Sequence, residues 1–331
     1  MTILVAPLNW GLGHASRCVP LVRRFLDEGH EVILGGDGES LTLLRRHFPK
    51  LRYTYLAPLD LRYSAGKSQV WAVVKALPRL VSWALKDHAM LAALLREERI
   101  DRVVSDNRFG LYNKGTQCIY LTHQLHIMLP KGWKWLEPLA ERLHARIYAR
   151  YDKVWVPDYE DLNKSLAGEL SHPISRLPSA VSRVEYIGPL SRFSGNLSPI
   201  AAHSYDVVAV LSGLEPQRTM LEKEIVARFA NGQEVLIVQG LMHRPNTRIK
   251  RGNITLVPSM TDAELVPALL GAKKIIARSG YSTLMDLHAL GLLKMTDSPS
   301  SVLRPQLELI PTPGQPEQDY LAVWTQKYTS L

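Results

Sequence analysis

Cysteine is scarce in this chain of 331 residues, with Cys18 and Cys118 as its only two thiols. Neither stands in a CxxC pair or in a Cys/His cluster with metal-ligand spacing, which argues against a disulfide framework and a zinc site. The sequence also lacks a run of about 18 consecutive apolar residues and a charged-then-apolar leader. We therefore expect an unprocessed, cytoplasmic protein with reduced thiols.

Excess positive charge is missing from the second half of the chain. Residues 1–150 contain 22 Lys and Arg against 13 Asp and Glu, whereas residues 151–331 contain 18 of each. The whole net charge of +9 thus lies in the first half, which suggests an anionic partner such as an acidic membrane surface or a phosphorylated substrate. Solubility alone would also explain the charge. We expect no nucleic-acid partner, because no recognised nucleic-acid motif accompanies the charge.

Strand and helix signals alternate along the first half. Apolar residues recur at helical spacing over 16–28, where Gly29 supplies a stop. A long helical region over 69–99 is expected to break near Pro78. The other expected elements are a helix over 40–48 and strands over 2–8, 30–36, 52–58, 101–106, 117–123 and, as the last strand of this sheet, 152–158.

The same alternation restarts at Tyr205, after a stretch (159–204) that is richer in Ser, Pro and Gly. Thr261 stands where it can cap the next helix. The pattern predicts an α/β protein with two doubly wound parallel-sheet domains, 1–158 and 205–331, joined by 159–204. The expected elements of the second domain are strands over 205–213, 233–240, 253–259, 273–280 and 307–314, and helices over 218–230, 262–272, 281–291 and 316–328.

Ligands of open parallel sheets bind beyond the carboxyl ends of the strands, and a cleft between two such domains is the default active site. Two loops suit a phosphate. "RSGYST" (278–283) presents backbone N–H groups and hydroxyls at the start of a helix, although a serine-capped helix start is an equally simple explanation. Arg218 opens a helix after "SGLEP" and could add a charge-assisted contact.

Three stretches carry a resemblance to one enzyme family: "GLGHASR" (11–17), "ARSGYSTLMDLHALGL" (277–292) and "LIPTPGQPEQDYLA" (309–322). They are similar to motifs of GT-B glycosyltransferases, nearest the family 28 group typified by the UDP-N-acetylglucosamine transferase of peptidoglycan lipid-intermediate synthesis. "THQL", "LSHP" and "YIGPLSRF" suggest an uncharacterised bacterial subgroup. The resemblance spans nearly the whole chain and implies two Rossmann-like domains that face each other across a cleft.

The resemblance also implies residue roles. Asp286 takes the place of a ribose-binding Glu, backbone around Pro258 to Met260 would hold the uracil edge, and His14 matches the histidine of the first-domain loop. The other implied substrate-binding residues are Gly11 and Gly13 beside His14, Ser279, Gly280, Tyr281, Ser282 and Thr283 for the donor diphosphate, and Gln315, Glu317 and Gln318 for the sugar hydroxyls.

Sugar transfer needs deprotonation of an acceptor hydroxyl and neutralisation of a departing diphosphate. A neutral histidine suits the first task, so we expect His14 as the base and Asp106 as the acid that orients it, with His123 as the rival base. No DxD-type pair stands in a site loop, so we expect no metal and no other cofactor. A single displacement of this kind inverts the anomeric centre.

Apolar residues rimmed by cations in the first half suit an anionic membrane surface at the inner face of the membrane and a lipid-linked acceptor. Ordinary core is the alternative for the helix, and Trp133 and Trp135 are the better candidates for surface anchors. The helical stretch carries Trp71, Leu77, Leu80, Val81 and Trp83 beside Lys75, Arg79 and Lys86.

Two other functions stay open. A UDP-sugar 2-epimerase of the same fold would need several acids around the sugar, and the site loops offer few. A catalytically silent protein that binds nucleotide sugars or membranes is favoured if the insertion over 292–306 disables the donor site.

Overall fold

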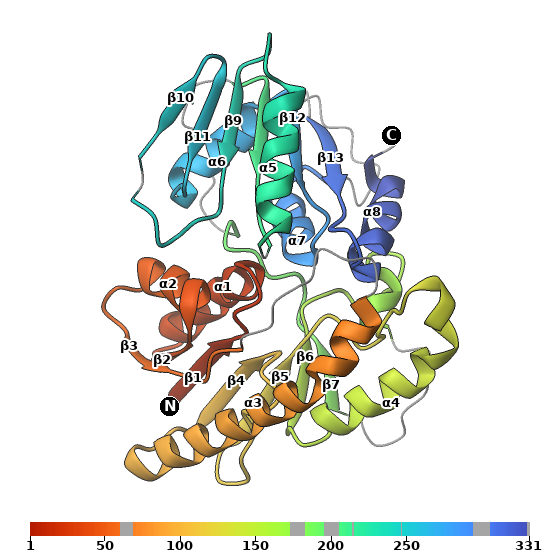
Figure 1. Cartoon of the computed structure of the whole chain (residues 1–331). Coiled ribbons are helices and arrows are strands. Elements are labelled where there is room, and N and C mark those ends of the chain that lie inside the picture. Colours follow the sequence, from red (N-terminus) through yellow and green to blue (C-terminus); the bar gives the residue numbers. More distant parts are fainter. Residues whose placement is uncertain are drawn as a thin grey trace. The chain divides into compact units, whose positions relative to one another are not determined.

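Two compact units make up the chain: Met1–Trp10 with His14–Leu190, and Gly11–Gly13 with Ser191–Leu331 (Figure 1). The computed structural model describes residues 1–59, 69–172, 183–194, 205–213, 215–245, 247–293 and 305–329, and only the backbone of 69–76 and 327–329. Each unit contains its own sheet of mainly parallel strands, which confirms the predicted α/β class. Most of the expected insertion over 292–306 lies outside the described residues.

The first unit is a doubly wound sheet with the strand order β3-β2-β1-β4-β5-β6-β7, and all the described pairs are parallel. The order reverses between β1 and β4, where Pro7 pairs in register with Asp106. The carboxyl ends of these two strands therefore form a switch point, the usual ligand position in such sheets. The strands are β1 Thr2–Pro7, β2 Glu31–Gly36, β3 Arg52–Tyr55, β4 Arg102–Asp106, β5 Gln117–Leu121, β6 Lys153–Val156 and β7 Val184–Tyr186.

Helices cover both faces of this sheet, because right-handed crossovers run in opposite directions from the switch point. Figure 1 shows α3 crossing in front of β4 and β5. Gly29 adopts a φ of 77° and ends α1, as predicted. The helices are α1 Gly13–Asp27, α2 Gly38–His47, α3 Gln69–Glu97 and α4 Glu137–Tyr148, with the 3-10 helices η1 Lys131–Leu136 and η2 Gly168–Ser171.

The expected break at Pro78 is absent, since α3 continues through this residue. A proline inside a helix removes one backbone hydrogen bond and clashes with the preceding turn, at a cost of about 3 kcal/mol. Beyond Pro78, Trp83 and Leu91 are buried in the core and hold the helix against the unit. Tertiary packing here outweighs the local cost of the proline.

The sequence suggested that the strand over 152–158 is the last of the first sheet, but one more strand, β7, follows it. β7 pairs in parallel with β6, with Val154 opposite Val184. Glu185 of β7 accepts hydrogen bonds from Lys153 Nζ at 2.6 Å and Trp155 Nε1 at 2.9 Å. A three-residue strand gives almost no periodic signal, and this one lies inside 159–204, the segment predicted to connect the domains.

The second unit has the strand order β10-β11-β9-β8-β12-β13, parallel except for β10, which runs antiparallel to β11. Its order reverses between β8 and β12. The backbone N–H and hydroxyl of Thr261 both donate to Glu264 Oε2 at 2.9 Å, which confirms Thr261 as the cap of α6. The elements are β8 Val207–Val210, β9 Val235–Val238, β10 Ile249–Arg251, β11 Ile254–Val257, β12 Lys274–Arg278, β13 Gln306–Ile310, α5 Gln217–Arg228, α6 Asp262–Gly271, α7 Tyr281–Ala289 and α8 Pro316–Thr329.

Candidate active site

His14 and Asp106 meet at the switch point of the first sheet. His14 is the second residue of α1, and Asp106 ends β4. His14 Nδ1 lies 2.7 Å from Asp106 Oδ1; the His14 side chain is 17% exposed, whereas Asp106 is buried. A carboxylate can only accept, so Nδ1 carries the proton and Nε2 is left as an acceptor. This is the tautomer that a general base needs.

Arg17 is the third member of this cluster. It lies one turn after His14 on α1, so both side chains project from the same face of the helix. Arg17 Nε donates to Asp106 Oδ2 at 2.6 Å, and Nη2 donates to Oδ1 in a second, shorter contact. Nη2 also lies 3.1 Å from His14 Nδ1, because both groups converge on one carboxylate oxygen. Arg17 is not among the residues that the motifs indicate, although its spacing of three residues from His14 is a usable signal.

Asp106 stays ionised despite its burial. Burial by itself would raise the pKa of this carboxyl, but Arg17 and His14 outweigh it and lower the pKa to about 2. The Cys18 thiol donates to Asp106 Oδ2 at 3.7 Å, and burial together with this carboxylate raises the pKa of Cys18 well above its usual value. The site therefore contains a permanent negative charge next to His14 and an unreactive thiol.

His123, the rival base, follows β5 and lies beside the same cluster. Its Nδ1 accepts a hydrogen bond from Arg17 Nη1 at 3.0 Å. His123 is 6% exposed, and so less accessible than His14. Because Arg17 is always protonated, it competes with any proton for Nδ1 of His123. His14 is the better placed of the two to receive a proton from a substrate.

In the second unit, the turn after β12 and the loop after β13 are tied together. The Ser279 hydroxyl donates to the Gln318 carbonyl at 2.8 Å, and Gln318 Nε2 donates to Gln315 Oε1 at 2.7 Å. Gln318 Oε1 accepts from the Thr312 backbone N–H at 2.8 Å. These bonds bring Ser279, Gln315 and Gln318 of the predicted donor set into one network.

The start of α7 presents the remaining predicted phosphate ligands. Ser279 and Tyr281 are buried, and the Ser279 hydroxyl is engaged by the Gln318 carbonyl. Gly280, Ser282 and Thr283 are half-buried, and the first N–H groups of a helix have no partner within it. Glu317, at the start of α8, and Met260, just after β11, are also half-buried.

Asp286 lies on α7 one to two turns beyond its start. Its Oδ1 accepts a hydrogen bond from the buried Ser191 hydroxyl at 2.6 Å. Burial raises the pKa of the Asp286 carboxyl to about 6, although Arg192 and Ser191 pull in the opposite direction. Asp286 is thus ionised at pH 7 and becomes neutral in mild acid.

Arg218 is already engaged by two carboxylates. Its Nε donates to Glu215 Oε1 at 2.8 Å, and its Nη1 donates to Glu222 Oε2 at 2.9 Å. The predicted phosphate contact of Arg218 would have to compete with both pairs. Glu222 lies one turn further along α5, whereas Glu215 precedes the helix.

The comparisons with known sequences are consistent with these observations. No protein-family model matches the chain. It is similar to uncharacterized glycosyltransferases of Methanosarcina acetivorans and Methanosarcina mazei, each 24% identical over 88% of this chain and 78% of the relative. These relatives are archaeal, whereas the motifs suggested a bacterial subgroup.

The structure of the chain is similar to solved structures of other proteins over almost its whole length. The spinosyn rhamnosyltransferase SpnG complexed with thymidine diphosphate matches 99% of this chain and 84% of that chain, with a TM-score of 0.56 and 15% identity. Phytolacca americana UGT2 complexed with UDP-2fluoro-glucose and pterostilbene matches 98% and 83%, with a TM-score of 0.56 and 16% identity. The fold is that of GT-B glycosyltransferases. The relatives and structural neighbours are glycosyltransferases, in agreement with the enzyme class that the motifs indicate.

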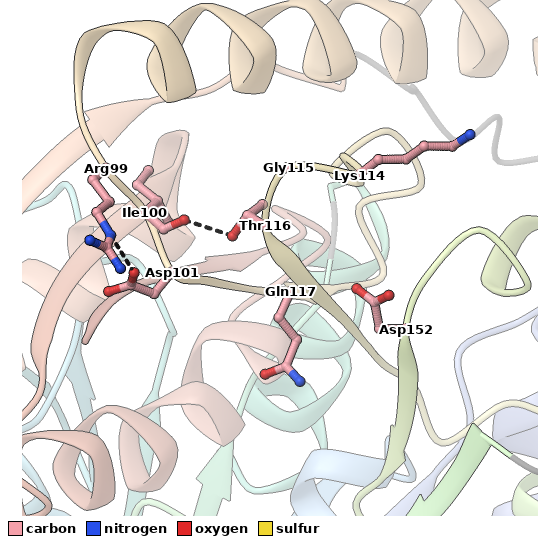
Figure 2. A pocket seen from close by; sticks show the side chains of 8 residues that line it. All are labelled: Arg99, Ile100, Asp101, Lys114, Gly115, Thr116, Gln117 and Asp152. Carbon is pink, nitrogen blue, oxygen red and sulfur yellow. Dashed lines mark hydrogen bonds and ion pairs between the residues drawn. The ribbon is translucent and has the colours of Figure 1, made fainter.

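Figure 2 shows a pocket of about 520 Å³ in the first unit, and His14 is not among the residues that line it. It is bordered by the segments that enter β4 and β5, at the amino ends of these strands. Arg99 Nε donates to Asp101 at 2.8 Å, and Thr116 Oγ1 donates to the Ile100 carbonyl at 2.7 Å, so these polar groups satisfy one another. The pocket is therefore not the candidate active site.

In the described part of the chain, no three His, Cys, Asp or Glu side chains gather in a way that could hold a metal ion. No helix within the same residues is both long and apolar enough to pass through a bilayer.

Trp83 does not belong to an exposed apolar face; it fits the ordinary-core alternative that the sequence left open for this helix. It is buried, and its Nε1 donates to the Ala57 carbonyl at 2.8 Å. Leu77 and Val81 on the same helix are exposed, and Trp135 on η1 is exposed as predicted. The side chains of Trp71 and Lys75 lie outside the described residues.

Proposed function

We propose that this protein is a metal-independent, inverting glycosyltransferase that moves a sugar from a nucleoside diphosphate sugar, specifically a UDP-sugar, to a hydroxyl acceptor. The observation that carries the proposal is the His14–Asp106 pair, in which the ionised carboxylate fixes the histidine tautomer. The GT-B fold and the glycosyltransferase relatives support the reaction class.

His14 acts as the general base in this reaction. Its Nε2 takes the proton of the acceptor hydroxyl while the acceptor oxygen attacks the anomeric carbon and the bond to the diphosphate breaks. One displacement of this kind inverts the anomeric centre. Asp106 stabilises the imidazolium that forms, and Arg17 holds Asp106 in place through its two hydrogen bonds.

The second unit binds the donor. Backbone N–H groups at the start of α7, with the Ser282 and Thr283 hydroxyls, bind the diphosphate at the positive end of the helix dipole. Asp286 accepts hydrogen bonds from the ribose hydroxyls. Gln315, Glu317 and Gln318 contact the sugar, and backbone near Met260 contacts the uracil. The nucleotide complexes of the structural neighbours SpnG and UGT2 support a nucleoside diphosphate as the ligand class.

The acceptor that we propose is lipid-linked and presented at an anionic membrane surface on the cytoplasmic side. Apolar side chains stand four residues apart on α3 and again across η1 and α4, and each is at least 49% exposed: Leu77, Val81 and Leu85, and Trp135, Leu139 and Leu143. Exposed cations accompany them: Arg79, Lys86, Lys131, Lys134, Arg142 and Arg146. This combination is typical of peripheral membrane helices.

Vesicle sedimentation tests the membrane proposal. The protein should pellet with vesicles that contain anionic phospholipid and much less with zwitterionic vesicles, and Val81→Glu and Trp135→Glu should each reduce pelleting. Val323→Glu is the matched control, because Val323 is an equally exposed apolar residue on α8 of the other unit. Equal pelleting by all four proteins would contradict the membrane proposal.

A panel of nucleotide sugars tests the activity. We expect release of free nucleotide from one class of donor, strong loss of this release in His14→Ala, and normal release in the control His30→Ala, which alters a histidine outside the site. Thermal shift measured on the same samples separates binding from turnover. Donor-dependent thermal shift without nucleotide release, even in the presence of membrane lipids, would contradict the transferase proposal and favour a silent binding protein.

A further inference from the structure

Arg278 places a buried guanidinium without a carboxylate partner at the carboxyl edge of the second sheet. The residue is 4% exposed and ends β12. Nη1 donates to the Pro311 carbonyl and Nη2 to the Gln217 carbonyl, both at 2.9 Å. Nε is buried without a hydrogen-bond partner. Burial lowers the pKa of Arg278, and Glu224 offsets this only in part.

The other buried arginines of the described chain differ from Arg278 in this respect. Arg17 is paired with Asp106, Arg108 with two aspartates, and Arg218 with two glutamates. A buried charge is costly unless an opposite charge compensates it. Two carbonyl oxygens supply only partial negative charge to Arg278. The second unit therefore has a positive charge that an anionic ligand can neutralise.

The position of Arg278 links it to the predicted donor loops. β12 lies between β8 and β13 in the sheet, and Arg278 pairs in register with Ile310. One of its carbonyl partners, Gln217, begins α5 after the loop that follows β8. The other, Pro311, begins the loop that leads to α8. Since Ser279 directly follows Arg278, this guanidinium connects all three loops that follow β8, β12 and β13.

We propose that Arg278 is the cation that balances the donor diphosphate and the positioning residue that holds these three loops together. The inference rests on the proposed function and deepens it, because it assigns to Arg278 the charge that the sequence had assigned to Arg218. The ligand class is a nucleoside diphosphate. The start of α7 and its hydroxyls contact the phosphate oxygens, while Arg278 supplies the compensating charge from within the unit.

Calorimetric titration of the full chain with UDP and with uridine tests the proposal, because the two ligands differ only in the diphosphate. Arg278→Gln should weaken UDP binding at least about tenfold and uridine binding less than about twofold. Arg278→Lys keeps the positive charge but loses the two Nη groups that bond separate carbonyls. Its ratio of UDP to uridine affinity should therefore stay within about threefold of wild type. Arg251→Gln removes an exposed arginine of β10 and should change neither affinity.

Three outcomes would overturn the inference. UDP binding unchanged in Arg278→Gln excludes both roles, and an equal loss of UDP and uridine binding reduces Arg278 to loop support. Should Arg278→Gln fail to fold, a collapse of the affinity ratio in a folded Arg278→Lys refutes the charge role. Failure of the proposed function looks different: the wild-type protein then binds neither UDP nor thymidine diphosphate, whereas failure of the inference leaves wild-type binding intact.

Discussion

Replacing Asp106 with asparagine should remove most activity by reversing the tautomer of His14. The asparagine amide can donate to Nδ1, which then becomes the acceptor, and the imidazole proton moves to Nε2. A protonated Nε2 cannot take the proton of an acceptor hydroxyl. We expect kcat to fall about 10²–10⁴-fold, the range attributed to a positioned general base.

The same substitution should destabilise the first unit. The Asp106 pKa of about 2, against 3.8 for an ordinary aspartate, corresponds to roughly 2–3 kcal/mol of stabilisation. Because the folded-state pKa is the lower one, this stabilisation is complete above about pH 4 and is lost as the pH falls through about 2. Asp106→Asn also leaves Arg17 buried without a counter-charge, so a total loss of about 3–5 kcal/mol is expected at pH 7.

Two measurements check this prediction. Initial rates of nucleotide release at saturating donor give kcat, and urea unfolding at pH 7 gives the stability. His14→Ala is the matched control, because it removes the base but keeps the Arg17–Asp106 pair, so it should lose a comparable rate with a smaller loss of stability. A folded Asp106→Asn protein whose kcat stays within about threefold of wild type would refute the tautomer argument.

Asp286, Gly110 and Arg108 allow further tests. Uridine affinity should fall between pH 7 and pH 5 as Asp286 is protonated near its pKa of about 6, and calorimetry on Asp286→Asn should show weaker uridine binding with little change over this pH range. Gly110→Ala should cost about 1–3 kcal/mol in urea unfolding, because its Cβ would lie 1.9 Å from the Ala84 carbonyl oxygen of α3. Arg108→Met should lower the free energy of unfolding by about 3–5 kcal/mol in the same measurement, because it leaves the buried Asp87 without its positive partner.

The sequence predicts the two sheets well, because strand and helix signals alternate along both halves of the chain. Short apolar runs separated by amphipathic segments suffice to predict two parallel sheets, and Gly29 and Thr261 mark helix ends through local chemistry. Once β1 and β4 are taken as neighbours at a switch point, the meeting of His14 with Asp106 follows from topology alone.

Side-chain partners are less accessible to sequence reasoning. Arg17 and Arg218 each stand on a helix near several possible partners, and only the packed structure decides that Arg17 binds Asp106 while Arg218 binds two glutamates. The isolation of Arg278 from carboxylates depends on the surroundings of a whole sheet edge. Strand β7 escapes prediction because three residues have no measurable period.

The rate of nucleotide release by His14→Ala tests the central claim most directly. The assay uses donor and acceptor at saturation, with UDP affinity and melting temperature measured on the same protein. Our account predicts a rate at least about 10²-fold below wild type, with both other quantities close to wild type. A rate within about threefold of wild type would contradict the assignment of His14 as the general base.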